Sequence, residues 1–97
     1  MLKTKKFEVT DYLKTEKDIE EYLAVVLEEK DYTFLPVALA DIARARKAMT
    51  SAAKAAGVSR TSLYQSLSAH GHPAFETVAK VADSLGYTIK LVPKGAT

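Results

Sequence analysis

The chain has 97 residues, 47% hydrophobic and 27% charged, with no cysteine. This composition predicts one soluble globular domain, and the absence of cysteine excludes a disulfide framework, a thiolate nucleophile and a cysteine-based zinc site. No apolar stretch approaches the roughly 20 residues that cross a membrane, and acidic residues follow the basic start Met1 to Lys6 where an export signal would be apolar, so we expect a cytoplasmic protein.

Charge is distributed unevenly along the chain. Residues 1–31 hold six lysines and nine acidic residues, a net charge of −3, whereas residues 41–72 hold five basic residues against one acid, a net charge of +4. An acidic first third followed by a basic middle is typical of a module that presents one face to phosphate. A solvated surface whose charges segregated by chance would give the same pattern.

Two amphipathic helices are predicted in the first half of the chain. The first covers 15–30, with Thr15 as N-cap and Asp18 completing a near capping box. The second covers 33–48, with Thr33 as N-cap and Pro36 in its first turn. Their apolar residues recur at helical spacing, so we expect the two helices to pack together.

A helix-turn-helix is predicted over 50–68. Thr50 would cap a short helix, and Gly57 offers the left-handed residue that ends it. Ser59 would cap a second helix at once. Four residues fit the packing of such a motif: a small side chain at the crossing, the turn glycine, a turn plug and a core anchor, namely Ala53, Gly57, Val58 and Leu63.

The second helix of this motif carries little apolar surface beyond Leu63 and Leu67, and its other face is polar. Arg60 can pair with a guanine edge and Gln65 with an adenine edge, while Tyr64 can meet a thymine methyl or a phosphate. We predict a DNA-binding surface in which further side chains contact phosphates or bases: Thr50, Ser51, Lys54, Ser59, Thr61, Ser62 and Ser68.

The last elements are a helix over 73–85, with His72 as cap and Pro73 at its first position, and a strand over 87–92. A lone strand has no partner within the chain. We therefore predict that two copies pair through it, with Tyr87, Ile89 and Leu91 at the dimer contact.

From Phe7 to Val92 the chain resembles the addiction-module antidote family, a branch of the Xre/Cro-like helix-turn-helix regulators. The resemblance rests on five separate blocks of the sequence: Phe7 to Thr15, Ala40 to Arg46, Gly57 to Ser68, His72 to Val78, and Leu85-Gly86. Two positions depart from the family pattern, since Ser51 stands where Gln is common after the capping Thr, and His72 replaces the usual Asn ahead of Pro73.

This resemblance implies an all-α, five-helix, Xre/Cro-like (lambda-repressor-like) bundle with a short C-terminal β-strand. It also implies a type II antitoxin: a homodimer that represses its own operon at a palindromic operator and holds a RelE-like ribonuclease toxin inactive. Two other functions fit the residues. One is a protein that binds a toxin or other partner through the acidic first helix and keeps the helix-turn-helix as a scaffold, and the other is a free-standing phage-type repressor.

Metal binding and catalysis are not expected. His70 and His72 have one residue between them and no convincing carboxylate or thiolate partner, which is more typical of a polar loop than of a metal site. The sequence contains no nucleophile elbow and no phosphate-cradling glycine loop. We expect neither an enzyme nor a cofactor-binding protein.

Overall fold

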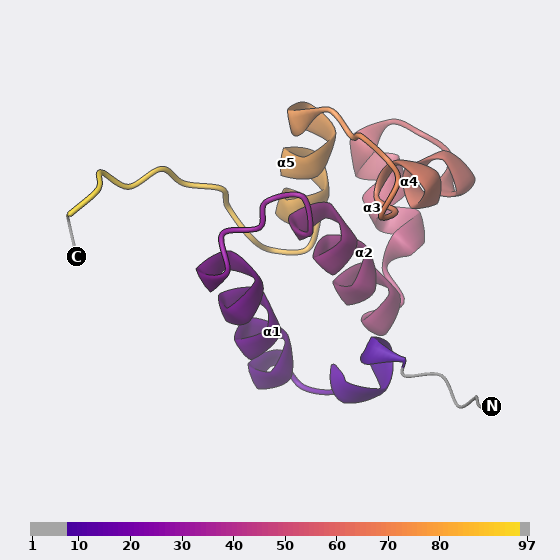
Figure 1. The fold of residues 1–97 in the computed structure, drawn as a ribbon. Helices are drawn as coiled ribbons and strands as arrows, with labels where there is room; N and C mark the ends of the chain where they lie inside the picture. Colours follow the sequence, from indigo (N-terminus) through magenta and orange to yellow (C-terminus); the bar gives the residue numbers. More distant parts are fainter. Residues whose placement is uncertain (1–7, 96–97) are drawn as a thin grey trace.

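The computed structural model describes residues 8–95, and the regular secondary structure in this part of the chain is helical, without a strand. Figure 1 shows the arrangement of the helices around a common core. The elements are the 3-10 turn η1 (Val9–Tyr12) and the helices α1 (Glu16–Glu28), α2 (Leu35–Ala45), α3 (Met49–Ala56), α4 (Arg60–Ser66) and α5 (Phe75–Ser84). Among the described residues, no helix has the length and apolar character needed to cross a membrane.

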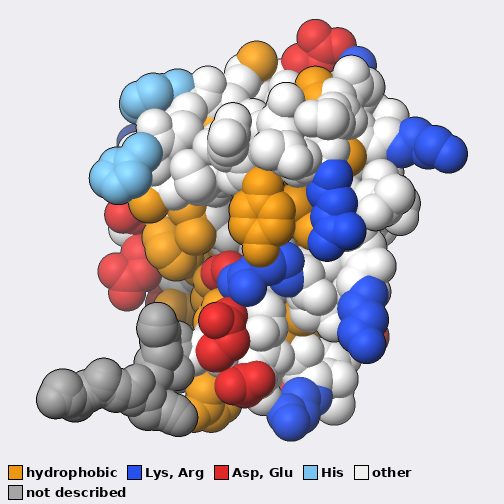
Figure 2. Space-filling model, turned by 90° about the vertical axis from the view of Figure 1, so that its right-hand side faces the viewer, with side chains coloured by type: hydrophobic (Ala, Val, Ile, Leu, Met, Phe, Trp, Pro, Cys, Tyr) orange, Lys and Arg blue, Asp and Glu red, His pale blue; other side chains and the backbone are white. Residues whose placement is uncertain are grey.

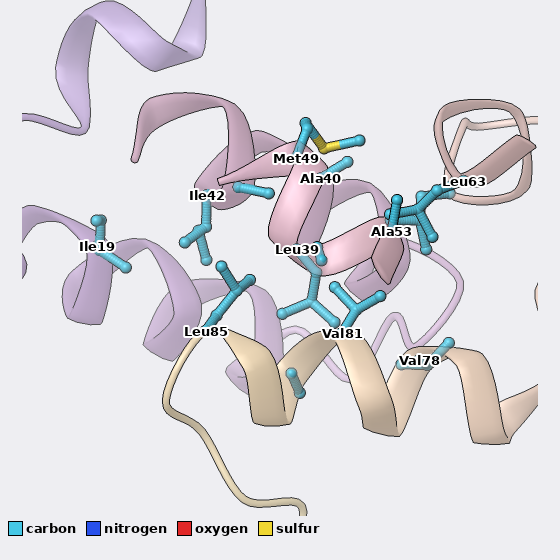
Figure 3. Packing of buried hydrophobic residues seen from close by; sticks show 14 of the residues in the cluster. Ile19, Leu39, Ala40, Ile42, Met49, Ala53, Leu63, Val78, Val81 and Leu85 are labelled. Carbon is cyan, nitrogen blue, oxygen red and sulfur yellow. The ribbon is translucent and has the colours of Figure 1, made fainter. Parts of the chain in front are cut away.

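The helix α2 lies at the centre of the bundle. Six consecutive residues of this helix, Ala38 to Ala43, are buried. The helix α1 packs along one side of α2, and α3 and α5 pack against it and against each other. Leu39 and Ile42 point from α2 into the cluster of buried side chains, where Val81 of α5 meets them (Figure 3).

Two predicted N-caps are confirmed. The Thr15 hydroxyl accepts a hydrogen bond from the Asp18 backbone N–H at 3.1 Å, and the Asp18 carboxylate accepts one from the Thr15 N–H at 3.0 Å, which forms a capping box. These backbone hydrogen bonds to the ionised carboxylate hold the pKa of Asp18 below its ordinary value. At α4, the Ser59 hydroxyl accepts from the Ser62 N–H at 3.0 Å.

Two other predicted N-caps are wrong, and α3 shows why. It begins at Met49 rather than after Thr50, because Lys47 has a left-handed φ of 56° and the Ala48 N–H then bonds the Ala43 carbonyl at 2.7 Å. This tight turn brings Met49 into the core as the first helical residue. At α2 the N-cap is Phe34, because the Thr33 hydroxyl bonds Asp31 instead of a helix N–H.

The cap and first residue predicted for the last helix are also wrong. The N-cap of α5 is Ala74, and the helix begins at Phe75 rather than at Pro73. His72 and Pro73 belong to the connection from α4. Gly71 at the start of this connection is packed against the end of α4, and three residues separate it from Phe75, where α5 begins.

The predicted C-terminal strand is not formed. Residues 87–92 follow α5 and leave the bundle as an irregular segment, which Figure 1 shows running away from the helices. A strand needs a neighbour for its backbone N–H and C=O groups, and the described chain of residues 8–95 offers none. Alternating apolar residues alone therefore did not specify a strand here.

The Arg46 side chain contacts α1, α5 and the segment that follows α5. Its guanidinium donates to the Leu85 carbonyl at 2.5 Å and to the Glu16 carboxylate at 2.7 Å. It also lies over the ring of Tyr87, 5.6 Å from the ring centre. One side chain at the C-terminus of α2 thus connects the start of α1, the end of α5 and the segment that follows.

A second network surrounds the buried carboxylate of Asp41. Tyr22 donates its hydroxyl to Asp41 at 2.6 Å and Arg44 donates at 2.8 Å, while Arg44 also reaches Glu8 at 3.1 Å. Burial, and secondarily the hydrogen bond to Asp41, raise the pKa of Tyr22 above its ordinary value. The hydrogen bond to Asp41 is the main cause that raises the pKa of Arg44. The hydrogen bonds of this network compensate the negative charge of the Asp41 carboxylate that α2 buries.

Replacing Arg46 tests whether this side chain holds the ends of the bundle together. Arg46→Ala removes two charge-assisted hydrogen bonds, so the free energy of unfolding should fall by about 2 kcal/mol. Lys17→Ala, which breaks an exposed ion pair with Glu21, is the control and should unfold close to wild type. Urea unfolding measures both, and equal midpoints for the two variants would contradict the role of Arg46.

Candidate nucleic-acid interface

The helices α3 and α4 form a pair joined by a three-residue turn, residues 57–59. Gly57 has a φ of 75°, which a glycine adopts without strain. The Gly57 N–H donates a hydrogen bond to the Lys54 carbonyl, and the Val58 N–H donates one to the Ala53 carbonyl, both at 3.1 Å. This pair of hydrogen bonds closes the end of α3. Ser59 then caps α4 directly.

The inner face of this pair is apolar and fully packed. Ala53 of α3 is 3% exposed, and Leu63 and Leu67 in and after α4 are completely buried. Figure 3 shows the side chains of Ala53 and Leu63 next to each other, so the small residue lets the two helices approach. Ala53, predicted at the crossing, and Leu63, predicted as the core anchor, are thus both buried between the two helices and the core.

Val58 does not plug the turn. Its side chain is 41% exposed, so it contributes little to the core. The backbone hydrogen bonds at Gly57 and Val58 already fix the turn, and Ala53 and Leu63 fill the space inside it. An apolar residue after the turn glycine was therefore a misleading signal for burial.

Every residue predicted to contact DNA lies at the surface of this part of the chain. All ten side chains are exposed, and they come from α3, the turn, α4 and the residues just after it: Thr50, Ser51, Lys54, Ser59, Arg60, Thr61, Ser62, Tyr64, Gln65 and Ser68. Within residues 8–95, the side chains of Arg60, Thr61 and Gln65 make no hydrogen bond to other groups. They are available to bind a ligand in solution.

The hydroxyls on this face differ in availability. Ser59 accepts the capping hydrogen bond from Ser62, and the Ser68 hydroxyl donates to the Gln65 carbonyl at 2.8 Å. These two side chains are held in place by the helix itself. Any contact that they make with a ligand has to use their remaining donor or acceptor.

The positive charge of the interface comes from fewer residues than the sequence indicates. Arg44 and Arg46 lie in the basic segment, but their guanidinium groups are paired with acids of the same chain. Lys47, Lys54 and Arg60 are exposed and, within the described part of the chain, form no ion pair. Figure 2 shows the side of the molecule that carries α3 and α4, with basic side chains spread over it among mostly uncharged surface.

Lys47 is a candidate that the sequence analysis did not assign to the interface. It is exposed and lies in the turn directly before α3, with a left-handed φ of 56°. A lysine just ahead of the predicted motif was the signal available in the sequence.

Gly71 fixes the position of the end of α4. A Cβ atom at this residue would lie 2.2 Å from the Ser66 carbonyl oxygen and 2.5 Å from that of Gln65. Only a residue without a side chain allows the connection after α4 to pack this closely on backbone atoms. The orientation of the exposed face of α4 thus depends on a glycine outside the helix.

Comparison with known proteins gives one family and one relative. Residues 3–93 match the model of a family described as "Probable addiction module antidote protein". The relative is an uncharacterized protein of Haemophilus influenzae that is 44% identical over 81 residues, which is 84% of this chain and 82% of the relative. No solved structure matches the chain.

Gly71→Ala tests the close packing on α4. The added methyl group meets backbone that cannot move away alone, so we expect a loss of stability of about 1–3 kcal/mol in urea unfolding. His72→Ala is the neighbouring control. Because His72 is exposed and Ala74 is the N-cap of α5, this variant should unfold as wild type does. A wild-type midpoint for Gly71→Ala would show that the close approach does not exist.

Proposed function

Because the chain belongs to the family of probable addiction module antidote proteins, we propose that it is an antitoxin that also binds DNA and represses transcription of its own operon. The proposal combines two activities. One is the neutralisation of a toxin, taken here to be a RelE-like ribonuclease, and the other is sequence-specific binding of an operator through α3 and α4. It assigns the chain no catalytic step.

The polar outer face of α4 carries the DNA-binding part of the proposal. This helix buries Leu63 and exposes Arg60, Thr61, Tyr64 and Gln65 beside one another. A helix needs few of these groups to pack on the bundle, but it needs such donors and acceptors to read base edges in the major groove. Arg60 is proposed to bind a guanine, and Gln65 an adenine.

The residues of α3 support the same geometry. As in a helix-turn-helix of the Xre/Cro type, the first helix crosses the DNA backbone while the second enters the major groove. Lys54, Thr50 and Ser51 are exposed on α3 and are proposed to hold phosphates, together with Lys47 in the preceding turn. These contacts position the protein and add affinity that does not depend on sequence.

A homodimer completes the proposal. The segment after α5 exposes 93% of Leu91 and 39% of Ile89, an apolar surface that a second copy can cover. Tyr87, which was also predicted at this contact, is half-buried beneath Arg46 and is assigned to the fold of the single chain instead. Two copies would place their α4 helices on half-sites about one DNA turn, roughly 34 Å, apart.

Two substitutions distinguish base reading from phosphate binding. Arg60→Ala should cost about 1–3 kcal/mol of affinity for DNA from upstream of the gene and relax the preference at one base pair. Lys54→Ala should weaken binding to all duplexes alike and lower the salt slope by about one. Fluorescence anisotropy at several salt concentrations, with a scrambled duplex for comparison, measures both effects.

The control for these two variants is Lys17→Ala, which removes the same charge from α1, away from α3 and α4 (Figure 1). It should bind DNA nearly as wild type does. Unchanged operator affinity for Arg60→Ala would show that α4 does not read the operator. Weak wild-type binding, equal for both duplexes and lost in salt, would leave partner binding as the function.

Leu91→Glu tests the dimer contact without disturbing the core, because 93% of this side chain is exposed. Sedimentation at micromolar concentration should find wild type as a dimer and the variant as a monomer, since a buried charge in each copy opposes the contact. Operator affinity of the variant should fall because dimerisation is lost. A monomeric wild type, or a variant that remains dimeric, would overturn the assigned contact.

A further inference from the structure

An apolar groove lies apart from the outer face of α3 and α4. It has a volume of about 1010 Å³ and is formed by α1, α2, the start of α5, the connections before α2 and after α4, and the C-terminal segment. Its apolar lining includes Leu23, Leu27, Tyr32, Leu35, Phe75 and Leu91. Among the residues that the structure describes, none from α3 or α4 lines the groove.

The groove is an open surface rather than an enclosed cavity. Tyr32 is 64% exposed, Phe75 is 71% exposed and Leu27 is 46% exposed, so large apolar side chains meet water along its walls. Contiguous apolar surface of this kind is typical of a protein-binding site. A small ligand would lack both enclosure and convergent polar groups.

The negative charge beside the groove favours a positively charged partner. Residues 16–31 hold seven acidic residues against two lysines, and they include α1 and the turn that follows it. Glu20 lies three and seven residues before Leu23 and Leu27, which places it on the same side of α1 as these two leucines. A partner that covers the groove therefore meets an apolar floor beside negative charge.

The C-terminal segment of the groove includes Ile89 and Leu91, which the proposed dimer contact also uses, but a second copy does not have the charge that matches α1. In a symmetric contact each surface meets its own copy, so the acidic helix α1 would face another acidic α1. Like charges brought together in this way oppose association. A ribonuclease, by contrast, must carry positive charge where it binds RNA phosphates.

We propose that this groove is the toxin-binding site, and that it holds the apolar side of a positively charged, amphipathic segment of the ribonuclease. The inference rests on the proposed antitoxin function and adds the surface and the chemistry of the contact. Apolar side chains of the toxin cover Leu27, Tyr32 and Phe75, and its basic side chains face α1. The outer face of α4 stays accessible to DNA in this complex.

The experiment uses the full chain and the purified product of the reading frame that adjoins its gene. Leu27→Gln and Tyr32→Ser each remove an exposed apolar wall of the groove, and each should weaken binding of that product about tenfold or more in calorimetry. Glu20→Gln should weaken binding less and reduce its dependence on salt.

Val25→Gln is the matched control for Leu27→Gln. Val25 lies on the same helix and is 55% exposed, but it is two residues from Leu23 and from Leu27 and therefore faces away from the groove. The affinity of the Val25→Gln variant for the product should stay within about twofold of wild type. Circular dichroism and operator binding, unchanged in all four variants, show that the fold is intact.

Three results overturn the inference, and each has a different meaning. If the groove variants and Val25→Gln bind the product as wild type does, the toxin binds elsewhere and the antitoxin function stands. If Leu27→Gln or Tyr32→Ser converts a dimer to a monomer in sedimentation, the groove is occupied by a second copy. If wild type does not bind the product at all, the proposed antitoxin function fails and the groove assignment fails with it.

Discussion

The central constraint of this fold is that α2 is buried on nearly every side. Residues Ala38 to Ala43 are enclosed by α1, α3 and α5, which requires small or aliphatic side chains along almost the whole helix. Asp41, the one buried charge among residues 8–95, is tolerated because Tyr22 and Arg44 donate hydrogen bonds to it. An unpaired carboxylate in this position would oppose folding. Arg46 then ties the helix ends around this centre.

Around the buried helix α2, the surface has two distinct faces: the outer face of α3 and α4, and the side formed by α1 and the apolar groove. Because the guanidinium groups of Arg44 and Arg46 are paired with acids of the same chain, the outer face of α3 and α4 relies on a few free cations and on uncharged polar groups. Such a face favours sequence reading over general attraction to phosphate. The acidic helix α1 packs on another side of α2, beside the apolar groove. The two proposed partners, DNA and the toxin, are therefore assigned to separate surfaces of the protein.

The sequence predicted the features that depend on local chemistry. The capping box at Thr15, the cap at Ser59 and the left-handed turn at Gly57 are all properties of a few neighbouring residues, and all are formed. Features that depend on distant contacts were not predicted. Thr50 is not the cap because the turn at Lys47 starts α3 at Met49. Arg46 was counted only as part of the basic segment, because its partners lie 30 or more residues away. Alternation in residues 87–92 did not suffice for a strand, because residues 8–95 hold no neighbouring strand to pair with it.

The most direct test of the account is to observe which backbone amides respond to operator DNA. Heteronuclear NMR of the isotope-labelled protein, titrated with a duplex from upstream of the gene, reports each amide separately. The account predicts that shifts concentrate in α3, the turn at residues 57–59 and α4, while the amides of α1 remain unchanged. Shifts centred on α1 and the groove, with α4 silent, would contradict the assignment of α4 as the helix that reads DNA.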